Sequence, residues 1–434
     1  MSDLRFRSAV SPLRRSFEAA PARSFSEYPT HATKRGRSAS HAFLRSDTSV
    51  DQVVAAERPS EPIHCLRPHV IAGNVRAFRA AFSGEVLYAV KCNPDPAVLR
   101  AVWAGGARHF DCASAAEVAL VRTMFPTATI HFMHPVKARP AIREAWQRQG
   151  VRDFVLDSAD ELTKILQEAG GGPDLGLFVR LALPKSNALY DLSGKFGAPF
   201  DEAVRLLRAA RPDAQRLGVH FHVGSQCMEP AAYARALALA GEAIRAAGVP
   251  VEVIDIGGGF PVSYPDVTPP PLEAFTAEIE AMSRTLDLPE GTQVWAEPGR
   301  ALVASGASVV LQVQLRRGDA LYVNDGVYGS LSDAGGPGFR FPVRLVGRGS
   351  TAAEHAFELF GPTCDSADRM RGPFLLPADV NEGDWIEVGQ LGAYGAALRT
   401  AFNGFDRARM VAVRDPPLLH TPGYPADNVL QLAA

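Results

Sequence analysis

The stretch EVLYAVKCNPDPAVLRAVWAGGARHFDCAS (residues 85–114) contains the unit that decides the fold of this chain. It opens with a short apolar run at 85–91 and continues with an amphipathic, Ala- and Leu-rich pattern at 96–106. A second apolar run follows at 109–114. A strand, a helix and a second strand in this order are typical of a parallel βα unit.

The same alternation continues to residue 300, with helical patterns between the apolar runs. The eight runs lie at 85–91, 109–114, 129–135, 153–158, 175–183, 216–225, 251–260 and 293–300. Eight βα units over about 215 residues fit a (β/α)₈ barrel of the TIM type. An open, doubly wound sheet is the alternative. The count of eight favours the barrel.

The pattern changes after residue 300, where strand-like runs follow one another with Gly-, Pro- and Asp-rich turns and hardly any helical pattern. These runs are SVVLQVQLRR, ALYVND, FRFPVRLV, HAFELFGPT, DWIEVGQ and ARMVAV. They predict a C-terminal all-β domain over residues 301–434, after a barrel over residues 51–300. Within the barrel part, residues 51–84 contain a candidate extra strand for the β-domain and a first barrel helix.

Length and composition exclude several classes of protein. The chain has 434 residues, 47% of them hydrophobic and 21% charged, and a net charge of −2. This balance argues against a dedicated nucleic-acid-binding protein, which is usually strongly basic. The chain contains no uncharged apolar stretch of about 18 residues, so we predict no membrane span. The five cysteines are scattered, so we expect neither a disulfide framework nor a metal site, and a reducing cytoplasm is the default location.

Residues 1–50 differ from the rest of the chain. They hold ten serines, nine Lys and Arg and four Asp and Glu, with no apolar periodicity. Such a segment buries too little apolar surface to offset the entropy of ordering it. We therefore predict a disordered basic tail. An organelle transit peptide, which has a similar composition, is the alternative.

Candidate reactive residues gather at the carboxyl ends of the predicted strands, where barrel enzymes place their chemistry. They are Lys91, Asp111, Ser114, Glu117, His134, Asp157, Arg180, His222, Ser225, Gly257, Gly258, Gly259, Glu297 and Arg300. Asp157 precedes Ser158 and is interpreted as a helix cap rather than a catalyst. The shared placement of the others indicates an active site at this end of the barrel.

A phosphate site is predicted at the loops after the seventh and eighth strands, which often bind phosphate in barrels. These loops contain GGGF (257–260) and EPGR (297–300). Glycines let backbone N–H groups approach an anion, and Gly299 and Arg300 add a further N–H group and a guanidinium. A flexible turn with a surface arginine is the alternative. It does not explain why both loops carry such residues.

Lys91 ends an apolar strand in a chain that has only six lysines among 45 Lys and Arg. Burial at the mouth of a barrel is expected to depress the pKa of its amine and make it a nucleophile toward carbonyls. A reactive lysine beside a phosphate site suggests pyridoxal 5′-phosphate as cofactor. Glu297 is the candidate for keeping the pyridine nitrogen protonated, and His222 for stacking on the ring.

Nine short motifs in this order resemble the ornithine/diaminopimelate decarboxylase family, the fold-type III pyridoxal-phosphate decarboxylases, and most of all its ornithine decarboxylases. The motifs are YAVKCN (88–93), FDCAS (110–114), HVGSQ (222–226), DIGGGFP (255–261), AEPGR (296–300), NDGVYGS (324–330), GPTCD (361–365), GAYG (392–395) and FNGF (402–405). The resemblance covers residues 65–410. It implies an alanine racemase-like barrel followed by a β-domain.

The resemblance also implies roles for individual residues. Lys91 would bind the cofactor aldehyde, Glu297 would pair with the pyridine nitrogen, and His222 would stack on the ring. The phosphate would be held by Ser225, Gly257, Gly258, Gly259, Gly299, Arg300 and Tyr394. The groups that position the cofactor and the lysine would be Asp111, Glu117 and Arg180.

Two further residues would act across a homodimer with shared active sites. Cys364 would control protonation of the substrate's α-carbon, and Asp365 would bind its distal amine, both from the second subunit. The expected reaction is decarboxylation of a basic L-amino acid, most simply ornithine to putrescine in polyamine biosynthesis. The family's usual Tyr-Asp pair after NDGVYGS is absent from LSDAGGPGFRFP (331–342), where Asp333 is the candidate substitute.

The absence of the Tyr-Asp pair leaves lysine or a modified diamino acid as alternative substrates. Diaminopimelate is a further alternative, although a lone Asp365 suits a distal ammonium better than a distal carboxylate. Alanine racemases would place arginine near the pyridine nitrogen, and Glu297 argues against them. A catalytically dead binding protein resembling the antizyme inhibitors is disfavoured, because Lys91 and Cys364 are present. Small single-barrel cofactor-binding proteins are disfavoured by the predicted β-domain.

Overall fold

The computed structural model describes residues 48–170, 174–184, 188 and 194–421. The predicted tail falls outside this part of the chain except for its last three residues. Eight parallel strands close into a barrel, with β2 pairing with β9. The strands are β2 (Glu85–Ala89), β3 (His109–Cys112), β4 (Thr129–Phe132), β5 (Asp153–Leu156), β6 (Gly176–Arg180), β7 (Arg216–His220), β8 (Val253–Asp255) and β9 (Gln293–Ala296). The predicted barrel is confirmed, and the open sheet is excluded.

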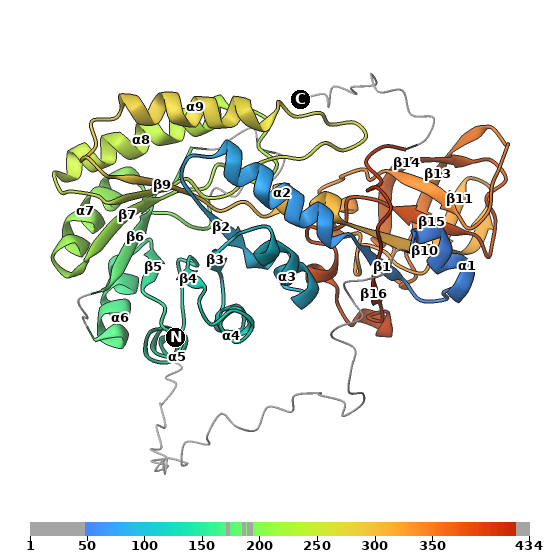
Figure 1. The fold of residues 1–434 in the computed structure, drawn as a ribbon, viewed down its shortest axis with the longest axis horizontal. Coiled ribbons are helices and arrows are strands. Elements are labelled where there is room, and N and C mark those ends of the chain that lie inside the picture. Colours follow the sequence, from blue (N-terminus) through green and yellow to red (C-terminus); the bar gives the residue numbers. More distant parts are fainter. Residues whose placement is uncertain (1–47, 171–173, 185–187, 189–193, 422–434) are drawn as a thin grey trace, which may run out of the picture. The chain divides into compact units, whose positions relative to one another are not determined.

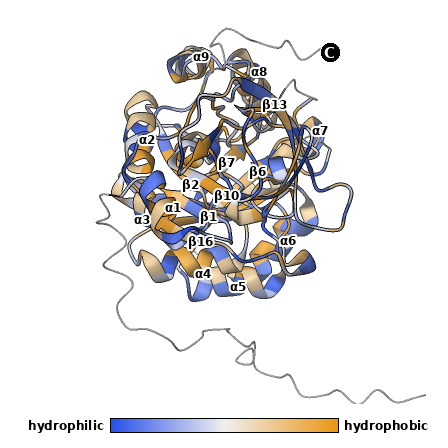
Figure 2. Ribbon diagram, turned by 90° about the vertical axis from the view of Figure 1, so that its right-hand side faces the viewer, coloured by the Kyte–Doolittle hydropathy of each residue, from blue (hydrophilic) through white to orange (hydrophobic). Residues whose placement is uncertain are grey.

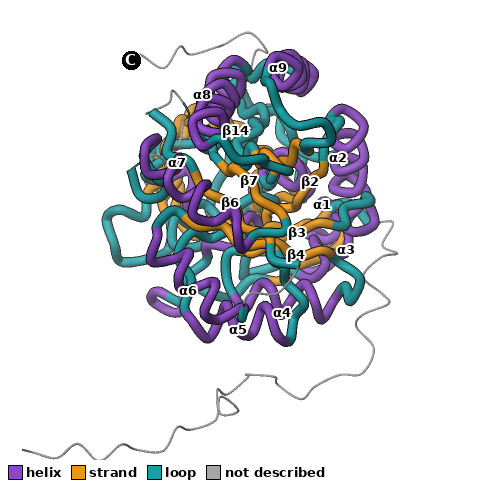
Figure 3. The backbone as a smooth tube through the Cα atoms, turned by 90° about the vertical axis from the view of Figure 1, so that its left-hand side faces the viewer, coloured by secondary structure: helices purple, strands orange, loops and turns teal. Residues whose placement is uncertain are grey.

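Helices surround the barrel strands, as Figure 3 shows. They are α2 (Pro68–Ala81), α3 (Pro96–Ala104), α4 (Ala115–Met124), α5 (Arg139–Gln147), α6 (Ala159–Ala169), α7 (Phe200–Ala210), α8 (Ala231–Ala247) and α9 (Leu272–Thr285). Hydrophobic and hydrophilic positions alternate along α4 and α5, as expected for helices with one face on a core (Figure 2).

Side-chain caps set where two of these helices begin. Ser114 accepts a hydrogen bond from the backbone N–H of Glu117 at the start of α4, and Ser158 does the same for Glu161 at α6. The interpretation of Asp157 as a cap was therefore wrong. Because Ser158 already caps α6, the Asp157 carboxylate is free to accept a hydrogen bond from the N–H of Gly197 (2.9 Å).

The barrel interior is packed with side chains rather than open. Large apolar side chains from different strands meet inside it, and Leu87, Val155, Phe178 and Trp295 are among its buried members. This filled layer leaves room for a cofactor only at the ends of the strands.

The remaining strands form a separate eight-stranded sheet (Figure 1). They are β1 (Ile63–Leu66), β10 (Ala307–Arg317), β11 (Ala320–Val323), β12 (Val343–Val346), β13 (Glu354–Phe360), β14 (Arg369–Pro377), β15 (Trp385–Val388) and β16 (Arg409–Ala412). The sequence pattern missed β14, because Gly372 and Pro373 interrupt its apolar run.

The sheet recruits chain from before the barrel. β1 pairs with β10 and β16, and α1 (Val50–Glu57) buries Val50, Val53 and Val54 against the same domain. The predicted division, which assigns this segment to the barrel, therefore differs from the structure. The extra strand and the first barrel helix expected within residues 51–84 are present. No helix in the described part of the chain is long and apolar enough to span a membrane.

Candidate active site

A pocket of about 440 Å³ lies at the carboxyl ends of the barrel strands. Most of the predicted site residues line it: Lys91, His134, Arg180, His222, Ser225, Gly258, Gly259, Glu297, Gly299, Arg300 and Tyr394. Neighbouring walls that the sequence did not single out as site residues are Ala89, Ala113, Met133, Pro135, Lys195, Phe196 and Phe260. Residues up to 305 positions apart in the chain thus meet around one cavity.

Lys91 lies in the short turn Val90–Cys92 that follows β2, and its side chain is 42% exposed because it opens into the pocket. Its Nζ lies 3.0 Å from Oδ2 of Asp111. Burial lowers the pKa of this amine, but the negative charges of Asp111 and Glu297 outweigh burial and raise it above its usual value. The expected depressed pKa was therefore wrong for this arrangement.

Asp111 is the penultimate residue of β3 and is almost completely buried. Burial and the nearby charge of Glu297 raise the pKa of its carboxyl, against the opposing effect of Lys91. A carboxyl with a raised pKa beside an ammonium is suited to exchange a proton with it. Glu117, by contrast, accepts from the N–H of Ala113 (2.7 Å) and serves the start of α4.

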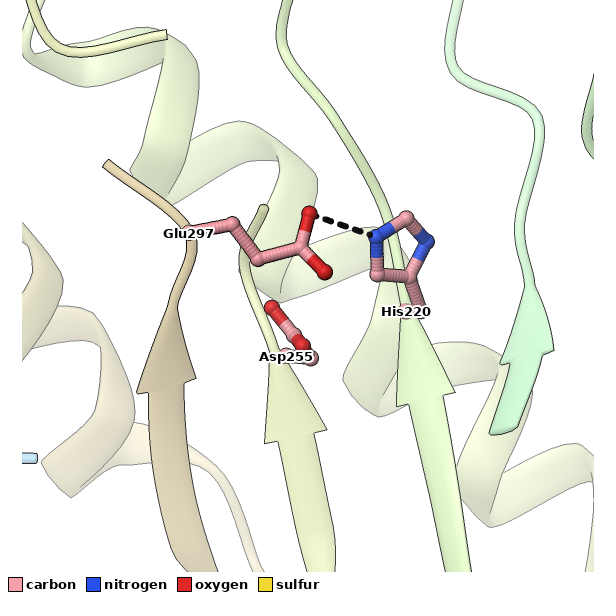
Figure 4. A group of neighbouring side chains, drawn as sticks. All are labelled: His220, Asp255 and Glu297. Atoms are coloured by element: carbon pink, nitrogen blue, oxygen red, sulfur yellow. Dashed lines mark hydrogen bonds and ion pairs between the residues drawn. The ribbon is translucent and has the colours of Figure 1, made fainter. Parts of the chain in front are cut away.

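Glu297 follows β9 and is 3% exposed. Its Oε2 lies 3.3 Å from Nε2 of His220, whereas Oε1 has no hydrogen-bond partner among the described residues. Figure 4 shows the two side chains and the hydrogen bond between them. Burial raises the pKa of this carboxyl, but the hydrogen bond from His220 and the charge of Lys91 lower it by more, so the net effect is a pKa below the usual range. Glu297 is therefore a buried negative charge with one oxygen open to a ligand.

The glycine loop after β8 approaches its neighbours too closely for side chains. Gly257 has φ +68°, and a Cβ atom there would lie 2.2 Å from the carbonyl oxygen of Phe221. Gly259 has φ +112°, and its Cβ would lie 2.5 Å from the carbonyl oxygen of Gly224. Gly258 and Gly259 line the pocket, whereas Gly257 shapes the turn behind it.

Arg300 stands beside this loop with its guanidinium buried. Its Nη1 lies 2.9 Å from the hydroxyl of Tyr264 and 2.9 Å from Oδ2 of Asp333. Nε of Arg300 has no hydrogen-bond partner among the described residues. Asp333 is thus engaged with the arginine and does not line the pocket. The prediction that it contacts substrate is corrected, because its charge holds Arg300 in place.

His222 and Arg180 form another wall of the pocket. Nδ1 of His222 accepts a hydrogen bond from the N–H of Gly224 (3.0 Å), which leaves the proton of a neutral ring on Nε2. Burial, Arg180 and Lys91 all lower the pKa of His222, so the ring is neutral. A neutral imidazole in a pocket wall is suited to stacking on an aromatic ligand.

Cys364 and Asp365 do not line the pocket. The Cys364 thiol is exposed and lies 3.3 Å from Oδ1 of Asn403. Asp365 accepts hydrogen bonds from the hydroxyl of Tyr328 and from the N–H of Ala367. The structure of one chain therefore does not bring these two predicted residues to the other site residues.

Sequence reasoning missed His220 and Asp255, which adjoin Glu297. Each is the last residue of its strand, β7 or β8, so the rule that placed the other site residues at strand ends could have found them. They were overlooked because the nearby motif residues His222 and Gly257 carried the argument.

The residues present fit pyridoxal 5′-phosphate. The open oxygen of Glu297 suits a protonated ring nitrogen, and the glycine loop with the free Nε of Arg300 suits a phosphate. The amine of Lys91 faces the same pocket and suits an aldehyde.

A family sequence model described as "Pyridoxal-dependent decarboxylase, pyridoxal binding domain" matches residues 69–304. The chain belongs to this family. It is a pyridoxal-phosphate-dependent decarboxylase of fold type III, and its cofactor is pyridoxal 5′-phosphate. Proteins similar to this chain include enzymes named ornithine decarboxylase, lysine/ornithine decarboxylase and arginine decarboxylase.

Three similar proteins illustrate the relationship. The ornithine decarboxylase of Schizosaccharomyces pombe is 35% identical over 352 residues, which cover 75% of this decarboxylase and 77% of the relative. The crystal structure of Vibrio vulnificus lysine/ornithine decarboxylase complexed with cadaverine has a TM-score of 0.72 at 33% identity, covering 83% and 95% of the two chains. The Paramecium bursaria Chlorella virus arginine decarboxylase has a TM-score of 0.74 at 28% identity, covering 84% and 99%.

Proposed function

We propose that this enzyme converts L-ornithine to putrescine and CO₂, a step of polyamine biosynthesis. The observation that carries the proposal is the single pocket in which Lys91, Glu297 and the phosphate loops converge. Relatives that act on ornithine and on lysine support a basic diamino acid as substrate.

When bound, the cofactor supplies an electron sink for the bonding electrons of the Cα–carboxylate bond. Glu297 keeps a negative charge at the ring nitrogen and so favours its protonated form. Lys91 must lose its proton before it can act as a nucleophile, and Asp111, 3.0 Å away, is the group placed to accept it. His222, in the wall of the pocket, would bound the ring on one side and exclude water there.

We propose further that the working enzyme is a homodimer in which Cys364 and Asp365 complete the pocket of the partner. The side chains of Leu398, Phe402 and Phe405, which follow the pocket residue Tyr394 in the chain, are 41% exposed or more. Asn403, which contacts Cys364, belongs to the same segment. Exposed apolar side chains clustered beside polar groups are typical of interaction surfaces. In this arrangement, Cys364 delivers a proton to the substrate's α-carbon.

Asp365 is the proposed partner of the distal ammonium of the substrate. The bonds from Ala367 and Tyr328 lower the pKa of its carboxyl, so it is negatively charged at neutral pH. L-Lysine is the second candidate substrate, because Asp333 is engaged with Arg300. Of the two carboxylates expected to bind the distal amine, only Asp365 therefore remains to distinguish substrates of different chain length.

The decisive test is CO₂ release by the purified enzyme, loaded with pyridoxal 5′-phosphate, from L-ornithine, L-lysine, L-arginine and meso-diaminopimelate. We expect the highest kcat/KM for L-ornithine. A higher value for L-lysine would favour the second candidate, and a preference for diaminopimelate would refute both. Asp365→Ala should raise KM for the preferred diamino acid about tenfold or more without weakening cofactor binding.

A further inference from the structure

Three buried titratable groups meet beside the pocket, where three neighbouring strands finish. His220 ends β7, Asp255 ends β8 and Glu297 follows β9 (Figure 4). Their side chains offer one nitrogen and two oxygens that lie within 4.8 Å of one another. All three residues are at most 3% exposed. Only Glu297 lines the pocket, so the other two act through it.

The hydrogen bonds around the triad of His220, Asp255 and Glu297 are too few to stabilise three charged groups. Oδ1 of Asp255 accepts from the N–H of Gly257 (2.9 Å), and Oε2 of Glu297 pairs with Nε2 of His220 (3.3 Å). Among the described residues, Oδ2 of Asp255 and Oε1 of Glu297 find no donor. Two buried carboxyl groups this close repel when both are ionised, and one shared proton removes the repulsion.

The surroundings of His220 also limit which atoms of the triad can carry a proton. Nδ1 of His220 also has no partner within the described chain, so a proton there would be a buried N–H group without an acceptor. A neutral ring that carries its proton on Nε2 donates to Glu297 and leaves only a lone pair unpaired. Burial lowers the pKa of His220, and burial together with the charge of Glu297 raises that of Asp255 well above its usual value.

We propose that Asp255 is a positioning residue that carries a proton and donates it in a hydrogen bond to Glu297, while neutral His220 donates to the other oxygen. The triad then holds one negative charge, and this charge is on Glu297. Two donors fix the plane of that carboxylate and direct it at the ring nitrogen of the cofactor. The inference rests on the proposed role of Glu297.

The chemistry of the variants makes this proposal testable. Asparagine at position 255 reproduces a protonated aspartate, because its oxygen can accept from Gly257 while its NH₂ group donates to Glu297. Leucine has a similar size but no donor. We therefore compare Asp255→Asn with Asp255→Leu, and His220→Gln with His220→Leu, as holoenzymes.

The first readout is infrared absorption of the wild-type holoenzyme minus that of Asp255→Asn. We expect a carboxylic acid C=O band that belongs to Asp255. A difference band of a carboxylate instead would overturn the proposal. The measurement needs no turnover, and it separates Asp255 from Asp111, which is present in both proteins.

The second readout is the pH titration of the visible absorption of bound pyridoxal 5′-phosphate. We expect the same midpoint in wild type and Asp255→Asn, and a midpoint shifted by about one unit or more in Asp255→Leu. If Asp255 were ionised, both substitutions would remove a charge and shift the midpoint alike, which would refute the proposal. His220→Leu should lower kcat about tenfold relative to His220→Gln, with KM much less affected.

Two controls keep the outcomes apart. Glu297→Gln tests the proposed role of Glu297 itself. If it leaves the cofactor titration unchanged, that role fails, whereas the infrared band of Asp255 still reports on the triad.

A histidine and two carboxylates also form a possible metal site. Stoichiometric metal in the active holoenzyme that is lost in Asp255→Asn would overturn the proposal in favour of a metal centre.

Discussion

The amine of Lys91 and the carboxylate of Asp111 form an ion pair 3.0 Å long at the ends of two adjacent strands. β2 and β3 pair in register so that Ala89 lies opposite Asp111, and the turn after Ala89 brings Lys91 over this carboxylate. The pair lies in the pocket beside Glu297. It therefore couples the reactive amine to the charges that surround the ring of the cofactor.

Replacing Lys91 with alanine should abolish turnover and the visible absorption that an amine-linked cofactor produces. The reason is that Lys91 lines the pocket and lies beside Asp111 and Glu297. Absorption spectroscopy and CO₂ release measure both effects. Lys164→Ala, whose lysine pairs with Glu161 outside the pocket, serves as a control that should keep both. A coloured, active Lys91→Ala enzyme would contradict the assignment.

Asp111→Asn should lower the pKa of Lys91, because a negative charge that favours the ammonium is removed. The rate at which the apoenzyme binds pyridoxal 5′-phosphate rises with pH as the amine loses its proton. We expect the midpoint of this rise to move about one unit or more toward lower pH in the variant. Stopped-flow absorbance measures it. An unchanged or higher midpoint would show that Asp111 does not control the charge of Lys91.

Asp333→Ala should weaken binding of the cofactor more than it raises KM for the amino acid. The carboxylate holds Arg300 at 2.9 Å, and Arg300 faces the phosphate side of the pocket. Loss of one charged partner corresponds to about a tenfold increase in the Kd of pyridoxal 5′-phosphate. Fluorescence titration of the apoenzyme measures this Kd. The opposite result, a large increase in KM with normal cofactor binding, would restore Asp333 as a substrate contact.

Cys364→Ala should keep the cofactor but slow decarboxylation by about tenfold or more, with some product protonated incorrectly. The thiol is exposed on one chain, so its proposed site of action is the pocket of a partner. Kinetics and product analysis in D₂O measure both effects. Equal rates and a single product would remove Cys364 from the mechanism.

A mixing experiment tests the shared site directly. Inactive Lys91→Ala and weakly active Cys364→Ala chains, combined in equal amounts, should regain about a quarter of the wild-type activity if each pocket needs residues from two chains. The absence of any gain on mixing would show that the sites do not form across a dimer.

Stability should fall as the pH decreases from about 6.5 to 4, partly because of His64. This residue is 4% exposed and lies 3.1 Å from the hydroxyl of Ser330. Burial, with the charge of Arg399, lowers its pKa to about 4, against the opposing effect of Asp325. In this window the unfolded state binds the proton and the folded state does not, so His64 costs about 1.4 kcal/mol per pH unit.

Urea unfolding of the holoenzyme at pH 7 and pH 5 measures the slope. His64→Gln, whose side chain does not titrate, should lose less stability over this interval than the wild type. Equal slopes for the two proteins would show that His64 is protonated in the folded state.

The sequence alone determined the architecture and most of the pocket. The alternation of apolar runs and helical patterns over residues 85–300 predicts eight parallel strands, since the period of burial is a local property of the chain. Because the carboxyl ends of barrel strands meet at one face, the same pattern placed Lys91, Glu297 and Arg300 together.

Only the tertiary structure decided the charges and partners inside that pocket. The raised pKa of Lys91 depends on Glu297, more than 200 positions away, and the role of Asp333 depends on its ion pair with Arg300. The pairing of β1 with β10 and β16 is equally non-local. Electrostatic effects depend on distance in space and on burial, and neither quantity can be read from the order of residues along the chain.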